Sequence, residues 1–232
     1  MDKRPVVGNQ RIANYADAKR ALRNVYNDSP RTLYCDCRYD PRRMEADASC
    51  GYQRQRGKPR VNWEHVVPAS HLGNHLPSWK GTDPKCRNAR GGPLYGRSCA
   101  RAIDRAFNLR EADLYNLYPS LMDLNRARGS LRPGMVRGEE REFGKCDFEI
   151  ERLVEPKPDR RGDFARVYAY MASAYPDADF LRSSMRRMME GWAKSDPVDA
   201  DECRRAFRIE EIQGNENPYV AEPCRASGLY RR

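Results

Sequence analysis

Apolar residues recur at helical spacing in several parts of the chain. The first stretch predicts an amphipathic helix over residues 12–27, because Pro30 follows it and cannot continue a helix. The same spacing predicts a helix before Pro176, another before Pro197 and a short one over residues 199–212. We interpret these apolar faces, with their Met and Tyr side chains, as core packing surfaces. The positions that define them are Tyr15, Ala18, Leu22, Val25, Phe164, Val167, Tyr168, Met171, Phe180, Leu181, Met185, Met188 and Trp192.

The middle of the chain has weaker patterns. Ile103, Phe107 and Leu114 can share a helical face, so we expect a helix that ends near Pro119, followed by a further turn or helix over residues 121–125. Residues 71–99 are rich in Gly, Pro, Asn and Arg. That composition predicts a long loop.

β-branched and aromatic side chains over residues 61–67 predict a strand or strand end, which Pro68 closes. Residues 33–63 contain cysteines, glycine, proline and short mixed runs. They predict irregular structure with short strands stapled by disulfides, because no strong helical period appears there.

Eight cysteines are spread along the chain rather than gathered in the paired spacing of a zinc ribbon. An even, dispersed set favours up to four disulfides and an oxidising compartment; buried free thiols in a cytosolic protein are the alternative. Cys86 with Cys99 is the local pairing we expect, within the predicted loop. Residues 1–30 carry no secretory apolar stretch, so we expect Met1 to begin a mature or recombinant form.

Charge narrows the classes of partner. Lys and Arg number 43 against 33 acidic residues, which gives a net charge of +10 and favours nucleic acid or an anionic membrane surface as partner. A basic surface without any such partner is the alternative. Only 39% of residues are hydrophobic, and no run approaches the roughly 18 apolar residues that a membrane span needs.

The densest chemical signal combines Glu64-His65 with Glu111 and Asn125-Arg126. Phosphodiester cleavage needs an activated water, a cation that neutralises the phosphate, and a positive side chain for the transition-state charge. Imidazole can act as the base near neutral pH, and carboxylate and amide oxygens are ligands that Mg²⁺ accepts. The set favours such chemistry, although a His65 satisfied within the core is the structural alternative.

The order Glu64-His65 constrains the backbone. Neighbouring residues on a regular strand point to opposite faces, so both side chains can meet one phosphate only where the strand bends. We therefore expect the strand to end or distort at these two residues, and Pro68 favours that position.

His71 and His75 stand four residues apart, a spacing that would allow zinc on a helix. Gly73 between them and Pro77 after them weaken a helix, so loop positions without metal are the preferred interpretation. The HExxH motif of zinc proteases is absent.

Several motifs in a fixed order resemble a known family, the bacterial endonuclease I family of nonspecific periplasmic and extracellular nucleases. The motifs are Tyr34-Cys35-Asp36-Cys37, Ser49-Cys50-Gly51-Tyr52-Gln53, Asn62-Trp63-Glu64-His65-Val66-Val67-Pro68-Ala69, Glu111-Ala-Asp-Leu-Tyr-Asn-Leu, Leu124-Asn125-Arg126, Arg160-Arg161-Gly162-Asp163-Phe164-Ala165-Arg166-Val167-Tyr168, Arg208-Ile209 and Ile212-Gln213-Gly214-Asn215-Glu216-Asn217-Pro218-Tyr219.

The resemblance implies a mixed α/β fold of the α+β class, with a ββα-metal core surrounded by helices and disulfide-stapled loops. It implies that a strand bearing His65 and a helix bearing Asn125 clamp one Mg²⁺, a site that Mn²⁺ or Ca²⁺ could also occupy. By the same resemblance His65 is the general base, Glu64 and Asn125 are metal ligands, and Glu111 orients a metal-bound water or the histidine.

The chain also departs from the family. Tyr115 stands where the family has His, and residues 126–130 replace a Gly-Asp-Arg-Ser-Asn run, which puts surface and loop contacts in doubt. The family's phosphate-binding Arg lies shortly before a Cys. Arg97, before Cys99, is the best match, with Lys85 and Arg87 as rivals.

The implied function is sequence-nonspecific hydrolysis of double- and single-stranded DNA, and of RNA, to leave 5′-phosphate ends. We expect residues 1–232 to form a single endonuclease I-like domain, a monomer in the periplasm or outside the cell and not in a membrane. Two alternatives are a catalytically silent nucleic-acid-binding or uptake protein of the same fold, and a secreted disulfide scaffold without a nucleic-acid role.

Overall fold

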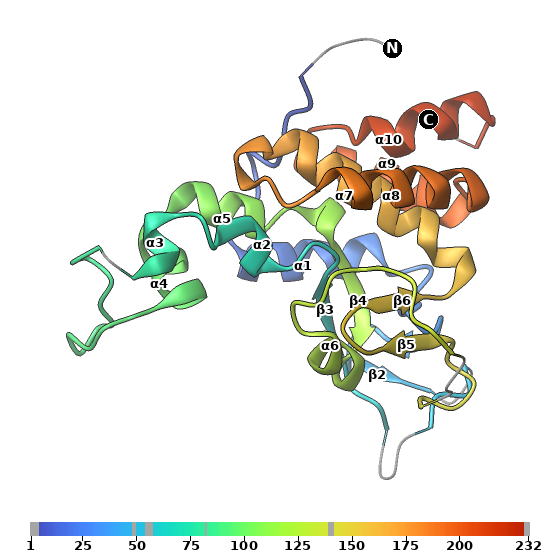
Figure 1. Ribbon diagram of the computed structural model, residues 1–232, viewed down its shortest axis with the longest axis horizontal. Helices are drawn as coiled ribbons and strands as arrows, with labels where there is room; N and C mark the ends of the chain where they lie inside the picture. The colour runs from blue at the N-terminus through green and yellow to red at the C-terminus, as the bar shows by residue number, and fades with distance from the viewer. Residues whose placement is uncertain (1–4, 48–49, 54–57, 82, 139–141, 230–232) are drawn as a thin grey trace.

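The computed structural model describes residues 5–47, 50–53, 58–81, 83–138 and 142–229 (Figure 1). Ser49, from the second family motif, lies outside them. Helices surround short two-stranded antiparallel sheets, with the helices of residues 161–226 gathered together and those of residues 69–111 extending to the left of the view. This confirms the predicted α+β class with disulfide-stapled loops.

The centre of the fold is a ββα unit. Strand β3 (Val61–His65) pairs antiparallel with β4 (Leu117–Leu121), with His65 opposite Leu117. Helix α6 (Met122–Arg128) follows β4 directly and packs on both strands. The predicted strand over residues 61–67 and the predicted turn or helix after residue 121 are thus confirmed, and β3 ends at His65.

The N-terminal part matches its pattern. Helix α1 (Tyr15–Val25) falls within the predicted range 12–27 and begins where the Asn14 side chain accepts hydrogen bonds from two backbone N–H groups. Strands β1 (Tyr39–Asp40) and β2 (Glu45–Ala46) form a short hairpin in the irregular segment. Disulfides Cys35–Cys146 and Cys37–Cys50 fix this segment, as predicted.

The long loop predicted over residues 71–99 is partly wrong. This region contains the end of α2 (Ala69–Gly73), all of α3 (Pro77–Lys80) and the start of α4 (Gly96–Ile103), so His71 lies in a helix. Helices of four or five residues are too short to show an apolar period. Pro77 opens α3, where its missing N–H costs nothing, and Gly81 ends it with a φ of 71°. The disulfide Cys86–Cys99 is present as predicted.

The single helix expected to carry Ile103, Phe107 and Leu114 and to end near Pro119 is also wrong. Asp104 ends α4 and caps α5 (Arg105–Glu111) by accepting from Phe107 N at 2.9 Å. A 3₁₀ turn, η1 (Leu114–Asn116), leads into β4, and Pro119 lies inside that strand. Every residue of β4 is buried, so no polar alternation marks it as a strand.

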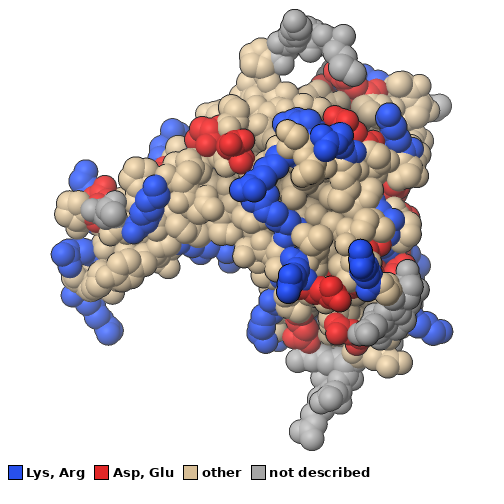
Figure 2. Space-filling model, in the orientation of Figure 1, with Lys and Arg blue, Asp and Glu red and all other residues tan. Residues whose placement is uncertain are grey.

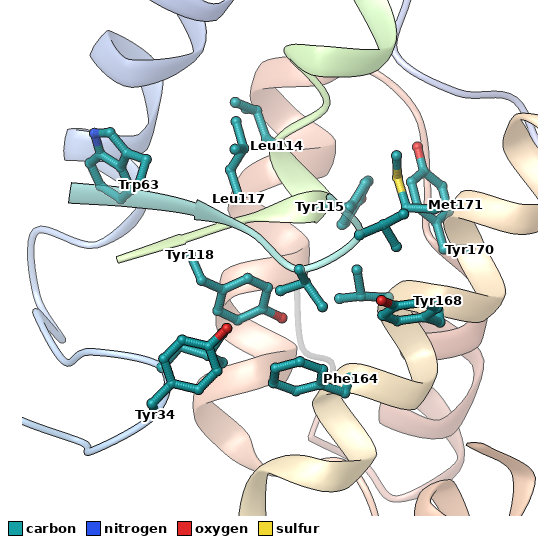
Figure 3. Close-up of a cluster of buried hydrophobic side chains, with 14 of the residues drawn as sticks. Tyr34, Trp63, Leu114, Tyr115, Leu117, Tyr118, Phe164, Tyr168, Tyr170 and Met171 are labelled. Carbon is teal, nitrogen blue, oxygen red and sulfur yellow. The ribbon is translucent and has the colours of Figure 1, made fainter. Parts of the chain in front are cut away.

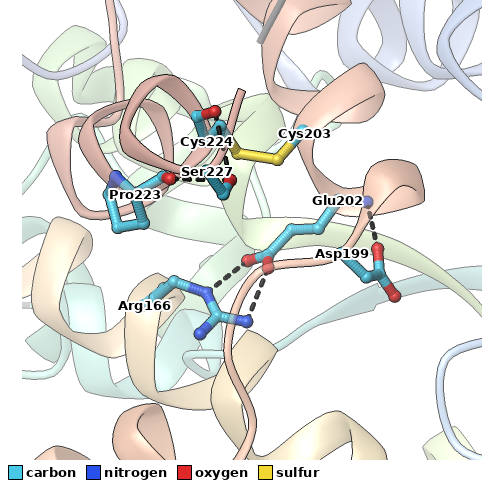
Figure 4. The surroundings of a disulfide bond; sticks show 7 residues. All are labelled: Arg166, Asp199, Glu202, Cys203, Pro223, Cys224 and Ser227. Atoms are coloured by element: carbon cyan, nitrogen blue, oxygen red, sulfur yellow. Dashed lines mark hydrogen bonds and ion pairs between the residues drawn. A yellow bond between two sulfur atoms is a disulfide. The ribbon is translucent and has the colours of Figure 1, made fainter. Parts of the chain in front are cut away.

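The C-terminal half is helical. The three predicted helices are confirmed as α7 (Arg161–Ala174), α8 (Ser183–Ser195) and α9 (Ala200–Gln213). The sequence did not predict helix α10 (Pro218–Ala226) or the antiparallel pair of β5 (Phe148–Ile150) and β6 (Val154–Pro156). Short 3₁₀ turns η2 (Pro158–Arg160) and η3 (Pro176–Ala178) flank α7. Cys203–Cys224 joins α9 to α10, beside the buried ion pair of Arg166 with Glu202 (Figure 4).

The main hydrophobic core lies between the β3–β4 pair and α7 (Figure 3). Tyr34, and Phe164 of α7, lie near Tyr118 of β4, with Tyr168 one turn further along α7, and all four are at most 6% exposed. The ββα unit therefore packs against a dense hydrophobic core.

Candidate active site

A cleft of about 420 Å³ opens at the end of β3. In Figure 2 the molecule is hollowed between the projecting α3–α4 part and the body that carries α6. The cleft is polar, and four of the five predicted site residues line it. Its lining residues are Tyr15, Asn62, Trp63, Glu64, His65, Pro68, Ala69, Ser70, Trp79, Arg97, Asn125, Arg128, Gly129 and Ser130.

His65 is held in one orientation. Its Nε2 lies 2.9 Å from the main-chain carbonyl oxygen of Glu111, which can only accept, so Nε2 carries the proton and Nδ1 has a free lone pair. The Tyr15 ring stacks at a tilt, 5.2 Å from the imidazole centroid. Burial, followed by the positive charge of Arg97, lowers the pKa of His65 to about 3, so the imidazole is neutral at neutral pH.

Glu64 is buried, 2% exposed, yet its carboxylate is not isolated. The Tyr34 hydroxyl donates to Oε1 at 2.6 Å, and Arg128 Nη1 donates to the same oxygen at 3.0 Å. Burial raises the pKa of Glu64, whereas Arg128 and the Tyr34 hydrogen bond act in the opposite direction. Burial is the largest of these effects, and the two partners offset part of it by favouring the charged form of the carboxylate.

Asn125 lies on α6, and its amide nitrogen Nδ2 faces β3. Nδ2 donates to Asn62 Oδ1 at 3.0 Å and to the Trp63 carbonyl oxygen at 3.3 Å. Both hydrogen bonds use the nitrogen, so neither occupies the amide oxygen. Because Asn125 and Glu64 line the same cleft, an amide oxygen and a carboxylate are available there together.

Glu111 is fully buried at the end of α5, and it does not line the cleft. Its carboxylate accepts from Arg101 Nε at 2.7 Å and from Arg97 Nε. Glu111 therefore contacts His65 through its main-chain carbonyl group, whereas the Glu111 carboxylate pairs with Arg97 and Arg101. Both guanidinium groups also lie over the Tyr15 ring, at 5.4 Å and 5.1 Å.

Arg97 has an unused donor. Its Nη2 is buried and has no hydrogen-bond partner among the described residues. Arg97 lines the cleft. Lys85 and Arg87, the other two candidates for the phosphate contact, are exposed and do not line it. Arg97 therefore lines the cleft and keeps one donor that no described residue uses, and guanidinium groups bind phosphate oxygens well.

Comparison with known proteins identifies the family of the chain. A sequence model of the family "Endonuclease I" matches residues 8–224. The chain belongs to the endonuclease I family. It is 35% identical over 217 residues to an extracellular deoxyribonuclease of Aeromonas hydrophila, covering 89% of this chain and 88% of that protein. It is 33% identical to a periplasmic deoxyribonuclease of the same organism, covering 93% and 88%, and 31% identical to Endonuclease-1 of Buchnera aphidicola subsp. Acyrthosiphon pisum, covering 96% and 86%.

Membership in the endonuclease I family implies a divalent cation, and the residues in the cleft fit one. The described residues contain no cluster of three or more His, Cys, Asp or Glu side chains that could hold a metal. Glu64 and Asn125 instead offer one carboxylate and one amide oxygen, a sparse set of hard donors. Mg²⁺ is commonly bound by one or two protein groups, waters and a substrate phosphate.

The sequence did not single out Arg128, which lies in the run 126–130 where the chain departs from the family. Arg128 is 1% exposed and one of the largest fully buried side chains. Besides Glu64, it donates to the carbonyl oxygens of His65 at 2.7 Å and Val66 at 2.6 Å. No sequence signal marks this role, because a charged residue near a helix end is ordinarily exposed.

Proposed function

We propose that this protein is a secreted or periplasmic endonuclease that hydrolyses DNA, and also RNA, without sequence preference and with one divalent cation. The observation that carries the proposal is the grouping, in one cleft, of a neutral imidazole, two oxygen donors and a guanidinium with a free N–H. The names of the extracellular and periplasmic deoxyribonucleases among its relatives support DNA as substrate.

His65 is the proposed general base. The Glu111 carbonyl oxygen accepts the Nε2 proton, which leaves Nδ1 to take a proton from the attacking water. The lowered pKa keeps the imidazole neutral at neutral pH, so the Nδ1 lone pair is unprotonated before the reaction. Glu111 acts as a positioning residue, through its carbonyl on His65 and its carboxylate on Arg97.

Glu64 and Asn125 are the proposed ligands of the cation, Mg²⁺ by preference, with Mn²⁺ or Ca²⁺ able to occupy the same donors. A bound cation supplies charge neutralisation at the phosphate and at the departing oxygen. Tyr34 and Arg128 favour the charged form of the Glu64 carboxylate and hold it in place for this role.

Arg97 is the proposed phosphate contact. Its free Nη2 donates to a phosphate oxygen and offsets charge that develops in the transition state. Phosphate contacts carry no base information, which supports cleavage without sequence preference. Cleavage on the 3′-oxygen side leaves 5′-phosphate ends.

Four disulfides support an oxidising compartment, in agreement with the locations named for the relatives. No helix in the described residues is long and apolar enough to span a membrane. We also propose that the chain forms a single domain and acts as a monomer.

The decisive test is incubation with supercoiled plasmid, with single-stranded DNA and with RNA, in the presence of Mg²⁺ or of EDTA. Nicking and linearisation that EDTA abolishes and excess Mg²⁺ restores are expected. His65→Ala is the matched control against a contaminating nuclease. Binding to DNA without any cleavage at any metal concentration would favour the silent binding protein, and neither binding nor cleavage would favour the secreted scaffold.

Product ends are tested separately. Ligation of the fragments without prior phosphorylation, after end repair of overhangs alone, is expected for 5′-phosphates. Fragments that a polynucleotide kinase labels without phosphatase treatment would contradict this part of the proposal.

A further inference from the structure

Residues 83–95 form an ordered hairpin between α3 and α4, which we call the basic arm. Its two sides are joined by Leu94 N donating to Cys86 O and by Asn88 N donating to Gly92 O, both at 2.8 Å. The Asn88 side chain accepts from Arg90 N and Gly92 N and so closes the tip. The arm is therefore a hydrogen-bonded turn with a defined shape.

The basic arm is fastened to the helix that carries Arg97. Cys86 and Cys99 are both buried, and their disulfide ties the arm to α4. Arg97 lies two residues before Cys99 on that helix, and Trp79 at the end of α3 lines the cleft. The arm consequently has a fixed direction relative to the cleft.

The basic arm contributes little to the core. Apart from Cys86, residues 84–91 are exposed, and no residue of 87–95 belongs to a buried hydrophobic cluster. Figure 1 shows the segment projecting from the rest of the molecule. Ordering a loop costs roughly 1–2 kcal/mol of backbone entropy per residue, so a fixed loop without a packing role is typically functional.

The charge on the basic arm is unpaired. Lys85, Arg87 and Arg90 are exposed, and in the described part of the chain no carboxylate lies within ion-pair distance of any of them. Arg97 and Arg101, by contrast, are paired with Glu111. Figure 2 shows basic side chains gathered along this projection. Asp83 is the only acidic residue of the arm, so the arm keeps an excess of exposed positive charge, which attracts a polyanion.

We propose that the basic arm is a second binding surface for the nucleic-acid backbone, which holds phosphates several nucleotides away from the one in the cleft. This deepens the proposed nuclease function and rests on it. Long polynucleotides span the cleft and the arm, whereas very short ones reach only the cleft. The arm thereby makes long chains the preferred substrates, because each additional phosphate that is bound adds affinity without reading sequence.

The test removes the three charges together, as Lys85→Gln, Arg87→Gln and Arg90→Gln in one variant. The matched control removes three exposed arginines of the α8 region, Arg182→Gln, Arg186→Gln and Arg187→Gln, so that net charge falls equally. Both sets are exposed and lie outside the cleft lining, and thermal unfolding checks that each variant keeps its fold.

Binding is measured first, in a His65→Ala background, by fluorescence anisotropy on duplexes of about 10 and about 60 base pairs over a salt series. The arm variant is expected to bind the long duplex at least tenfold more weakly, with a salt slope lower by about 0.9 for each phosphate that the arm no longer neutralises. The short duplex and the α8 control are expected to change much less. Equally weakened binding in both variants would overturn the proposal.

Cleavage then separates this proposal from the nuclease itself. With His65 restored, the arm variant is expected to cleave the short duplex at the unmodified single-turnover rate at saturating protein. A slower rate on the short duplex would place the arm in the catalytic step and overturn the proposal. If the unmodified protein cleaves nothing, the nuclease function fails while the binding result still decides whether the arm holds DNA. Weakened binding only to anionic phospholipid vesicles, with DNA binding unchanged, would assign the arm to a membrane surface instead.

Discussion

Arg128 offers the sharpest test of how the site is held, through the substitution Arg128→Met. The guanidinium donates to Glu64 Oε1, His65 O and Val66 O, and the side chains of Arg128 and Glu64 are at most 3% exposed. Methionine fills part of the volume but donates nothing. The substitution therefore leaves a buried carboxylate without its counter-charge and two carbonyl groups without a donor.

Removing one partner of a buried ion pair costs about 3–5 kcal/mol. With a urea m-value of about 3 kcal/mol per M, the unfolding midpoint is expected to fall by about 1–1.7 M. Arg126→Met is the matched control, because Arg126 lies on the same helix, carries the same charge and is exposed. Its expected change in the free energy of unfolding is within about 0.5 kcal/mol.

A second substitution isolates the charge. Glu64→Gln in the Arg128→Met background removes the unpaired carboxylate, so the double variant is expected to be destabilised by less than the sum of the two single effects, by about 1 kcal/mol or more. The measurement is urea unfolding followed by circular dichroism at fixed pH and salt. If Arg128→Met unfolds at the midpoint of Arg126→Met, or if the two single effects simply add, the ion pair of Arg128 with Glu64 does not stabilise the site.

Three further outcomes are expected at the cleft. His65→Ala lowers the single-turnover cleavage rate by at least roughly 10²–10⁴-fold while DNA affinity in a filter-binding assay stays close to that of the unmodified protein; a variant with more than a tenth of the original rate would remove His65 from the role of base. Glu64→Ala and Asn125→Ala each raise the Mg²⁺ concentration for half-maximal activity and weaken Mn²⁺ binding in calorimetry, and unchanged titrations would mean that the ligands lie elsewhere. Arg97→Ala costs more in turnover than in binding, whereas Lys85→Ala weakens binding alone; the reverse pattern would transfer the phosphate contact to Lys85.

The four helices that apolar spacing at the two ends of the chain predicted share one property, which is length. Helices α1, α7, α8 and α9 have 11 to 14 residues each, enough for an apolar stripe to repeat. α3 has four residues and no such repeat. The sequence did not predict β4 for a different reason. All its side chains are buried, so they show no polar alternation, and Pro119 suggested the end of a helix.

The candidate site was predicted as a set of side chains and could not be predicted as a set of interactions. Glu64, His65, Arg97 and Asn125 line one cleft, but the partner of His65 is the carbonyl group of Glu111, which every residue type possesses. A backbone acceptor leaves no trace in the sequence. The position of the Glu111 carbonyl group depends on the end of α5 lying beside β3, which is set by tertiary packing.

The spacing on α6 explains how so sparse a site can keep its geometry. Asn125 and Arg128 are three residues apart and therefore share one face of the helix. Arg128 binds Glu64 and two carbonyl groups at the end of β3, while Asn125 bonds to Trp63 one residue before Glu64. The distance between the two proposed ligands is thus set by the packing of helix on strand. A cation bound by only two protein groups needs that rigidity, because misplacement of either donor leaves no third ligand to compensate.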